Sequence, residues 1–336
     1  MKVTLHEVAA RADVSIATVS RAVNGLAVSP ASLAKVREAI AELGYVANDA
    51  ARALRSDRSH TMGIIFSDLR NTLGIDLLDG LSDTIEEAGY SLIIATARGD
   101  AHRFDVLMHR FLERRVDALF CIRPPGKVES LPRYAAAKVP VMAMFGASGA
   151  FSRLPNMSPS FSEPAAALAE HLRALGHRRI AILQPQRRAA GMDAIGEILK
   201  GEGLGVEAVE MAEGVGTAEI VRSLISRADR STVVLVSDPA VRGVMAACAA
   251  LGVETPGDLS LVSLNDITSG AYHRKHGLSS VTVDPQRMGR ACGAAMLAWL
   301  AGSRPADRTQ VQSATFHPRT TTGAAPALAS RESAGA

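Results

Sequence analysis

The first 44 residues place their hydrophobic side chains at the spacing of three short helices. Thr4 and Glu7 stand three positions apart, as in a capping box, and three apolar residues between positions 5 and 9 would share one face of the first helix. Asp13 then indicates a tight turn. A short helix followed by such a turn is typical of the first half of a helix-turn-helix.

The second and third helices have recognisable ends in the sequence. Ser15 can cap a helix over residues 16–24, which Gly25 would end. Ser29 opens a third helix, with Pro in its first turn, and Gly44 would end it. The apolar face predicted for this third helix consists of Leu33, Val36, Ile40 and Leu43.

Residues 45–60 differ from the segments on either side and predict a linker. Asn48 is a potential helix cap, and the Ala, Leu and Arg residues that follow predict a short, weak helix. That helix would end in the polar stretch SDRSH.

From residue 61 onward, apolar strands alternate with helices. The strands include TMGIIFSDL, SLIIATA, DALFCI and RRIAILQP, which are nearly continuous in their hydrophobicity. Strands of this kind are buried on both faces and favour parallel, doubly wound sheets. The alternation runs for longer than one sheet comfortably holds, so we divide it into two lobes at the Gly-, Ser- and Pro-rich segment ASGAFSRLPNMSPSFSEP.

The expected fold class is therefore α/β, with a helical unit at the N-terminus. The expected divisions are a three-helix headpiece at 1–47, a hinge helix and linker at 48–60, a two-lobed core at 61–322 and a disordered tail at 323–336. Lobe 1 is expected to take about 61–149 plus 284–303, and lobe 2 about 156–282 plus 308–322.

Composition adds only broad limits. The chain has 336 residues, of which 47% are hydrophobic and 21% charged, and a net charge of +3, which by itself does not indicate a nucleic-acid partner. Cys121, Cys248 and Cys292 lack metal-ligand spacing and suit small buried positions in a reducing cytosol. No signal peptide or membrane span is visible, so we expect a cytoplasmic protein that does not bind membranes.

The predicted second helix offers a surface suited to DNA. Hydroxyl and amide groups at its start can bond phosphates, and an Arg one turn later can bond a guanine edge through two hydrogen bonds. The residues expected on this outward surface are Ile16, Ala17, Thr18, Ser20, Arg21 and Asn24. From these features alone, a helical pair of this size is as often part of a structural bundle.

The complete sequence of these segments decides between a DNA-binding helix pair and a structural bundle. VTLHEVAARADVSIATVSRAVNG and the following VSPASLAKVREAIAELGYVANDAARALRS closely resemble the headpiece of the lac repressor family. The resemblance continues in family order through MGIIFSDLRN, LERRVDALF, HLRALGHRRIAIL and FHPRTTT, and it covers nearly all of residues 3–322. A gluconate-repressor-like member of the family is one option.

The resemblance implies roles for individual residues of the headpiece and hinge. Ile16, Ala17 and Arg21 match positions that read bases in the major groove. The matches to phosphate-holding positions are Thr4, Ser15, Thr18, Ser20, Asn24 and Ser29. Asn48 matches the start of the hinge helix, and Leu54, with Ala51 beside it, matches the leucine that opens a central base step from the minor groove. The alternative for Leu54 is a packing contact within the linker. The loop after Asn24 is about one residue shorter than the family pattern.

The resemblance also implies a core similar to periplasmic sugar-binding proteins, with an effector bound beyond the carboxyl ends of the strands. The residues expected there are Asp68, Asn71, Arg98, Arg123, Arg188, Ser237, Asp238 and Asn265. Arg188 matches the family's ligand arginine, whereas Asn265 replaces its sugar-binding Asp and Ser237 replaces an Asn.

These departures leave two interpretations open. In the first, a cationic pocket holds an anionic effector such as a sugar acid, because an arginine fork suits a carboxylate and a neighbouring acid would repel it. In the second, the pocket has degenerated and no small molecule matters.

Other function classes find little support in the sequence. It contains no Gly-rich phosphate loop, no H-E-x-x-H and no G-x-S-x-G, and His102 and His109 lack partners for a metal site. A transport receptor or cytosolic sugar-binding protein would fit the core but not the headpiece. We therefore expect no enzyme and no cofactor, but a regulator, most simply a repressor, that binds double-stranded, pseudo-palindromic operator DNA as a homodimer. No heptads follow residue 322, so no zipper-built tetramer is expected.

Overall fold

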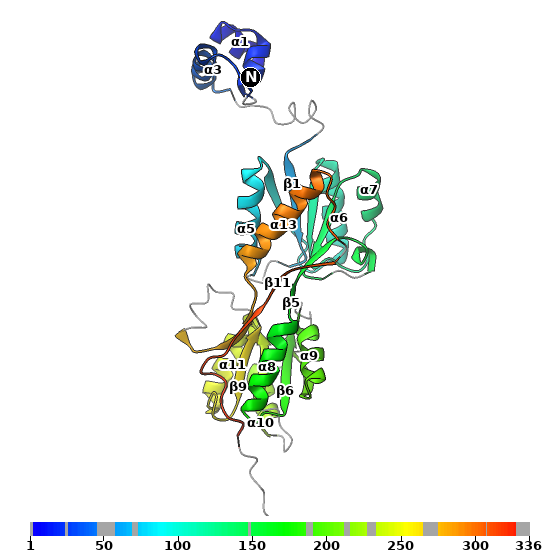
Figure 1. Cartoon of the computed structure of the whole chain (residues 1–336), viewed down its shortest axis with the longest axis vertical. Helices are drawn as coiled ribbons and strands as arrows, with labels where there is room; N and C mark the ends of the chain where they lie inside the picture. The colour runs from blue at the N-terminus through cyan, green and yellow to red at the C-terminus, as the bar shows by residue number, and fades with distance from the viewer. Residues whose placement is uncertain are drawn as a thin grey trace, which may run out of the picture. The chain divides into compact units, whose positions relative to one another are not determined.

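The computed structural model divides the chain into two units, Met1–Ser59 and His60–Ala336. The residues described in it are 3–23, 26–45, 58–68, 73–146, 149–185, 191–211, 216–226, 233–264, 275–306 and 308–326 (Figure 1). The predicted hinge helix at 48–55 lies outside the described residues, and so does the tail from 327 onward.

The first unit contains the three predicted helices, α1 (Leu5–Ala12), α2 (Ile16–Val23) and α3 (Pro30–Leu43). The capping box is present, since the Thr4 Oγ1 accepts from the Glu7 N–H at 3.3 Å and the Thr4 N–H donates to Glu7 Oε2 at 2.7 Å. Asp13 turns the chain in the left-handed conformation (φ 47°), and Gly44 ends α3 in the same conformation. The local signals in the sequence thus set the ends of these helices.

The core of the first unit is small. Val8, Val19 and Val36 bring one buried side chain from each helix to its centre, and Ala39 is buried beside them. Ile40 and Leu43, from the predicted apolar face of α3, are only partly buried against this cluster. A core this small depends on well-formed helix ends, because each cap contributes about 1 kcal/mol.

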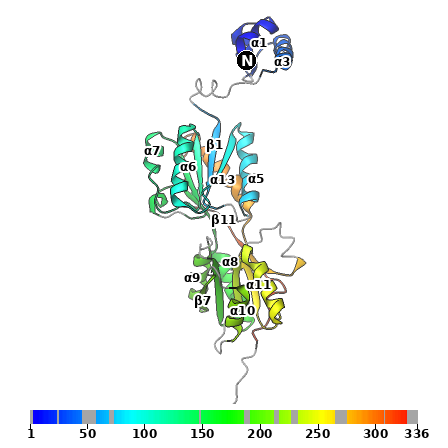
Figure 2. The ribbon, with the colours of Figure 1, turned by 180° about the vertical axis from the view of Figure 1, so that it is seen from behind.

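Two six-stranded sheets form the second unit, each with helices on both sides (Figures 1 and 2). The first sheet has the order β11-β5-β4-β3-β1-β2, with β1 (Thr61–Phe66), β2 (Ser91–Thr96), β3 (Ala118–Ile122), β4 (Val141–Met144), β5 (Asn156–Ser160) and β11 (Arg308–Ser313). The second sheet has the order β12-β10-β9-β8-β6-β7, with β6 (Arg179–Pro185), β7 (Gly205–Met211), β8 (Val233–Ser237), β9 (Ser260–Leu264), β10 (Ser279–Thr282) and β12 (Thr315–His317).

The α/β fold class is confirmed, with one refinement. All pairings within the two sheets are parallel except that of β10 with β12, which is antiparallel. The β1 strand is buried on both faces, as its continuous hydrophobic run predicts. Its Ile64 contributes to one core cluster and its Ile65 to another, because successive side chains point to opposite faces.

The helices cover both sheets. The first sheet is flanked by α5 (Leu73–Glu87), α6 (Ala101–Glu113), α7 (Leu131–Ala136) and α13 (Pro285–Leu300), and the 3₁₀ turn η1 lies at Gly149–Phe151. The second is flanked by α8 (Ser162–Ala174), α9 (Met192–Gly201), α10 (Thr217–Ser226) and α11 (Asp238–Leu251).

The predicted boundary between the lobes is wrong for two strands. Residues 156–160 and 308–313 were expected in lobe 2, but as β5 and β11 they hydrogen-bond to each other, and β5 also pairs with β4 of the first sheet. Sheet membership depends on this ladder and not on the composition of the loop before it. The chain therefore passes between the sheets after β5, between β10 and α13, and between β11 and β12.

The C-terminal segment is anchored in the second lobe, which corrects the predicted start of the tail at 323. His177 Nε2 lies 2.9 Å from the Gly323 carbonyl oxygen, and the Ala325 N–H donates to the Leu175 carbonyl at 2.7 Å. The Thr321 Oγ1 donates to the Leu261 carbonyl and accepts from the Ser279 N–H, each at 2.8 Å. Residues 319–325 thus form part of the fold.

Two helices of the first lobe approach closely through glycine. A Cβ atom at Gly289 of α13 would lie 2.2 Å from the Leu77 carbonyl oxygen of α5, and one at Gly80 of α5 would lie 2.1 Å from the Gln286 carbonyl oxygen. These contacts are with backbone atoms, which cannot move aside as the end of a side chain can. The α5–α13 spacing therefore requires glycine at both positions.

We predict that Gly289→Ala destabilises the chain by about 1–3 kcal/mol, because the helices must separate to admit the methyl group. Gly201→Ala is the matched control, since a Cβ there meets nothing within 4 Å and Ala favours a helix more than Gly does. Thermal unfolding followed by circular dichroism measures both. Equal melting temperatures for the two variants would contradict the prediction.

His177 should make stability fall as the pH is lowered. Burial lowers the pKa of His177, the Gly323 carbonyl opposes that shift, and His171 nearby lowers the pKa further. Because the unfolded His titrates near 6.5, the unfolded chain binds more protons below about that pH, and stability is lost as the pH falls through it.

The measurement is the free energy of unfolding in urea at neutral and mildly acidic pH. His177→Gln should reduce the pH dependence relative to the parent chain. If His177→Gln retained the full pH dependence, burial of this imidazole would not be its cause.

Candidate functional site

The outward face of α2 brings the predicted base-reading residues together. Val19 is fully buried and orients the helix, while Ile16 is 42% exposed and Ala17 and Arg21 are also exposed. Ile16 is among the few large hydrophobic side chains left in solvent in the part of the chain that the structure describes. An apolar side chain and an exposed Arg on one face are suited to a thymine methyl and a guanine edge.

Arg21 has a contact that the sequence did not predict. Its Nε donates to the Ala27 carbonyl at 3.2 Å, which ties α2 to the loop before α3. A guanidinium has five N–H groups, so a bond through Nε is compatible with a fork made by the two terminal nitrogens. The contact limits the directions in which that fork can point.

Three of the predicted phosphate contacts occupy helix N-termini. Ser15 accepts from the Thr18 N–H at 3.1 Å at the start of α2, and Ser29 accepts from the Ser32 N–H at 3.2 Å at the start of α3. Thr4 does the same for α1. Helix N-termini favour anions through their unpaired N–H groups and the helix dipole. Thr18 and Ser20 are half-buried on α2 itself.

Thr4 differs from the other two caps because an acid lies beside it. Its hydroxyl donates to Glu7 Oε2 at 2.9 Å, and the Thr4 N–H lowers the pKa of the Glu7 carboxyl. The carboxylate is therefore ionised at neutral pH next to a predicted phosphate contact. The capping-box spacing was visible in the sequence, but the direction of this hydroxyl was not.

Several predicted contacts lie outside the described residues. For DNA these are Asn24, Asn48, Ala51 and Leu54, and for the effector they are Asn71, Arg188 and Asn265. Ser237 ends β8 and Asp238 begins α11, so their backbones stand at the carboxyl end of a strand in the second sheet.

The three described effector candidates of the first lobe occupy one edge of its sheet. Phe66, the last residue of β1, pairs with Thr96 of β2 and with Ile122 of β3. Asp68 therefore follows the end of β1, the middle strand of the three. Arg98 follows the end of β2 on one side, and Arg123 follows the end of β3 on the other. Asp68 and Arg123 are half-buried, and Arg98 is exposed.

Both arginines sit in strained backbone positions. Arg98 has a φ of 53° and Arg123 a φ of 49°, in the left-handed region that costs a non-glycine residue about 1–2 kcal/mol. Hydrogen bonds hold these turns, from the Arg98 N–H to Thr96 Oγ1 at 3.3 Å and from the Arg123 N–H to the Met144 carbonyl at 2.9 Å. Phe145, just after β4, shares the conformation with a φ of 59°. Such strain is frequent in ligand sites.

The described ranges contain no candidate metal site, and their cysteines are buried. No group of three or more His, Cys, Asp or Glu residues is placed there to hold a metal ion. Cys121, Cys248 and Cys292 are buried, as expected, and burial raises the pKa of each thiol. None of the described helices is long and apolar enough to cross a membrane.

Comparison with protein families identifies both units. Residues 4–48 match the model described as bacterial regulatory proteins, lacI family, and residues 169–322 match the periplasmic binding protein-like domain. The first match covers α1, α2 and α3, and the second begins in α8 of the second lobe.

Individual proteins agree with this assignment. The HTH-type transcriptional regulator GntR of Pseudomonas aeruginosa is 30% identical over 321 residues, which cover 90% of this chain and 91% of that protein. Catabolite control protein A of Priestia megaterium is 27% identical over 277 residues, covering 79% and 83%.

The fold has solved counterparts as well. The lac repressor dimer bound to operator and an anti-inducer superposes with a TM-score of 0.81 at 24% identity, covering 96% of this chain and 100% of that one. The family match to the headpiece, the related regulators and the shared two-lobed fold all agree. The chain belongs to the LacI family and is a DNA-binding transcriptional regulator with a periplasmic-binding-protein-like domain.

Proposed function

We propose that this regulator is a repressor that binds a pseudo-palindromic operator as a homodimer. The observation that carries the proposal is the exposed face of α2, where Ile16, Ala17 and Arg21 stand beside the capped N-termini of the headpiece helices. A protein dimer with two-fold symmetry presents two such faces, so its operator should contain two related half-sites. The lac repressor supports this assembly, since it is a dimer on its operator.

We propose further that an anionic carbohydrate, such as a sugar acid, modulates this repression. Arg98 and Arg123 flank Asp68 at the carboxyl edge of the first sheet, where open α/β sheets bind ligands. Guanidinium groups suit a carboxylate, and Asp68 can accept from sugar hydroxyls. The predicted Arg188 and Asn265 would complete the site from the second lobe.

A second candidate is a regulator without an effector. It is favoured by the same neighbourhood, because an acid that stands between two arginines can equally form a structural charge cluster.

A neutral sugar is the alternative kind of effector. CelR, a transcriptional regulator with the same fold at a TM-score of 0.65, was solved in a complex with cellobiose.

The recognition role of Arg21 gives a direct test of operator binding. Arg21→Ala should weaken binding to DNA from the upstream region of the protein's own gene by about 1–3 kcal/mol and relax the preference at one base pair per half-site. Arg37→Ala removes the same charge from an exposed position on α3 and should cost less. Mobility shifts on a set of operator variants measure both effects. An identical profile for the two variants would remove Arg21 from base recognition.

The effector proposal predicts a charge-selective ligand response. Gluconate should raise the melting temperature of the full chain, whereas glucose at the same concentration should not, because only gluconate carries a carboxylate for the arginines to bind. A ligand that binds the folded state alone stabilises it by about 2.7 kcal/mol at a concentration of a hundred times its Kd. Arg123→Gln should abolish the response, and Arg110→Gln, an exposed substitution on α6, should retain it. Stabilisation by glucose alone would replace the anionic effector with a neutral one. No response to a panel of sugars, sugar acids and sugar phosphates would favour the regulator without an effector.

A further inference from the structure

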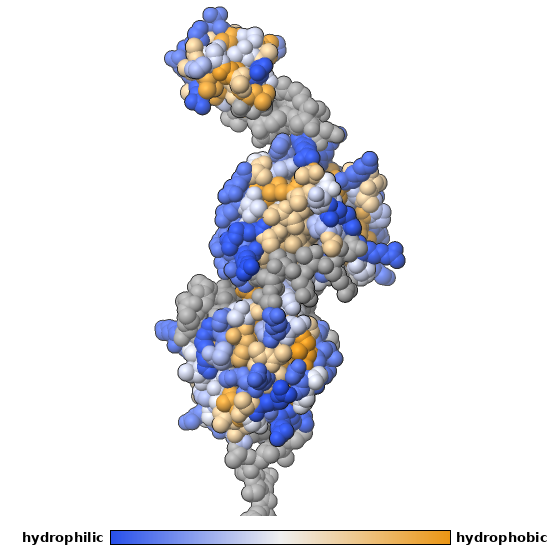
Figure 3. Space-filling view, viewed as in Figure 1, coloured by the Kyte–Doolittle hydropathy of each residue, from blue (hydrophilic) through white to orange (hydrophobic). Residues whose placement is uncertain are grey.

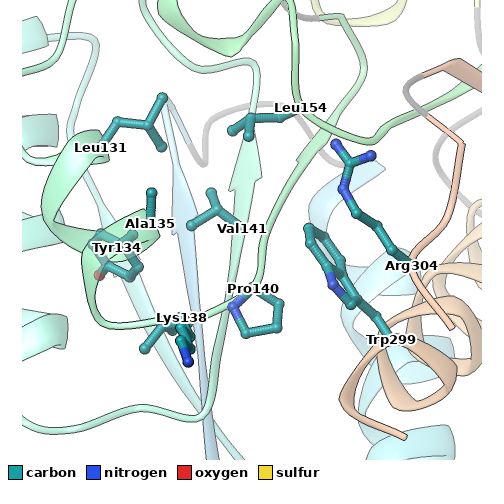
Figure 4. Close-up of a pocket in the computed structure, with 10 residues that line it drawn as sticks. Leu131, Tyr134, Ala135, Lys138, Pro140, Val141, Leu154, Trp299 and Arg304 are labelled. Atoms are coloured by element: carbon teal, nitrogen blue, oxygen red, sulfur yellow. The ribbon is translucent and has the colours of Figure 1, made fainter. Parts of the chain in front are cut away.

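A small apolar groove lies in the first lobe, apart from the predicted effector residues. Its volume is about 320 Å³, and it runs between α7, the start of β4 and the C-terminal end of α13. Trp299 faces Pro140 and Val141 across the groove (Figure 4), and Leu154 closes one side. Hydrophobic residues also gather on the surface over α13 (Figure 3).

The walls of the groove are fixed by the fold. The Tyr134 ring is 1% exposed, and its hydroxyl donates to the Met108 carbonyl at 2.7 Å. Val141 is the first residue of β4 and pairs with Leu119 of β3. Trp299 packs against the main hydrophobic core. A preformed site loses little conformational entropy when a ligand binds.

The charges around the groove have one sign. Lys138 and Arg304 are exposed at its rim, and no Asp or Glu is found among the described residues that line it. The Arg304 guanidinium lies 5.7 Å from the centre of the Trp299 ring, and its Nη2 donates to the Arg153 carbonyl at 3.5 Å. These contacts keep a cation above an apolar floor. The complementary ligand has an apolar body and one negative end.

The groove is distinct from the predicted effector site. It borders the start of β4, whereas Asp68, Arg98 and Arg123 follow the ends of β1, β2 and β3. Because these strands are parallel, the two sets of residues belong to opposite edges of one sheet. The amino edge is also where β1 begins at Thr61, shortly after the DNA-binding unit ends at Ser59.

We propose that this groove binds a small amphipathic carboxylate, with a single ring or short alkyl chain between Trp299 and Pro140 and the carboxylate at Arg304 (Figure 4). The volume is at the lower end of the range for small-molecule sites, which suits a ligand of this size. A second copy of the chain would instead require a broader complementary surface.

Trp299 is the only tryptophan in the chain, so its fluorescence reports on the groove directly. Titration of the full chain with 3-phenylpropionate and with octanoate, excited where only tryptophan absorbs, should give a saturable change in emission. The neutral 3-phenylpropanamide should bind about five- to tenfold more weakly, because it lacks the charge that Arg304 attracts.

Variants separate this site from its surroundings. Arg304→Gln should weaken 3-phenylpropionate about five- to tenfold, whereas Lys127→Gln, an exposed residue outside the groove, should have no effect. Arg123→Gln should also leave this binding unchanged, since it belongs to the other edge. The same emission titration measures all three.

Two outcomes would overturn the proposal. One is the absence of a saturable change with either acid up to millimolar concentration, or equal affinity for the acid and the amide. The other is an emission change that depends on protein concentration without ligand, since that would assign the groove to a contact between copies of the chain.

Discussion

Parallel pairing of β1 with β2 and β3 is the constraint on which both proposed small-molecule sites depend. The ladder aligns Phe66 with Thr96 and with Ile122, so the residues that follow these strands meet at one edge. The same ladder sends the starts of β1 and β4 to the opposite edge. One set of backbone hydrogen bonds therefore separates an edge rich in arginine from an edge that contains an apolar groove.

The close approach of α5 and α13 supports this sheet from one side. Glycine at positions 80 and 289 lets the two backbones come nearer than any side chain would allow. The α13 helix follows β10 of the second sheet and ends at Trp299 and Leu300, beside the groove. A change in how the lobes meet would thus act on a helix that is rigidly packed in the first lobe. Rigid packing of this kind transmits displacement instead of absorbing it.

The headpiece follows a different principle. In its described part the core has six buried residues, all of them Val or Ala, so local hydrogen bonds at the helix ends carry a large share of its order. The same caps are the proposed contacts to a DNA phosphate backbone, because helix N-termini favour anions. Under that proposal, the stability of the headpiece and its contact with DNA depend on the same atoms. At Thr4 the two roles would conflict, since its hydroxyl already donates to the Glu7 carboxylate.

The sequence by itself determined the local features of this protein. The capping box at Thr4, the turn at Asp13 and the ends of α3 depend on residues within four positions of one another, and each is found as predicted. The alternation of strands and helices and the family resemblance followed from the same kind of short-range pattern. Tertiary structure alone decided the rest, because it depends on contacts between distant segments. The pairing of β5 with β11 joins residues about 150 positions apart and moved both strands into the first sheet. The burial of His177 beside Gly323 and the groove at Trp299 likewise arise from side chains whose partners no local spacing reveals.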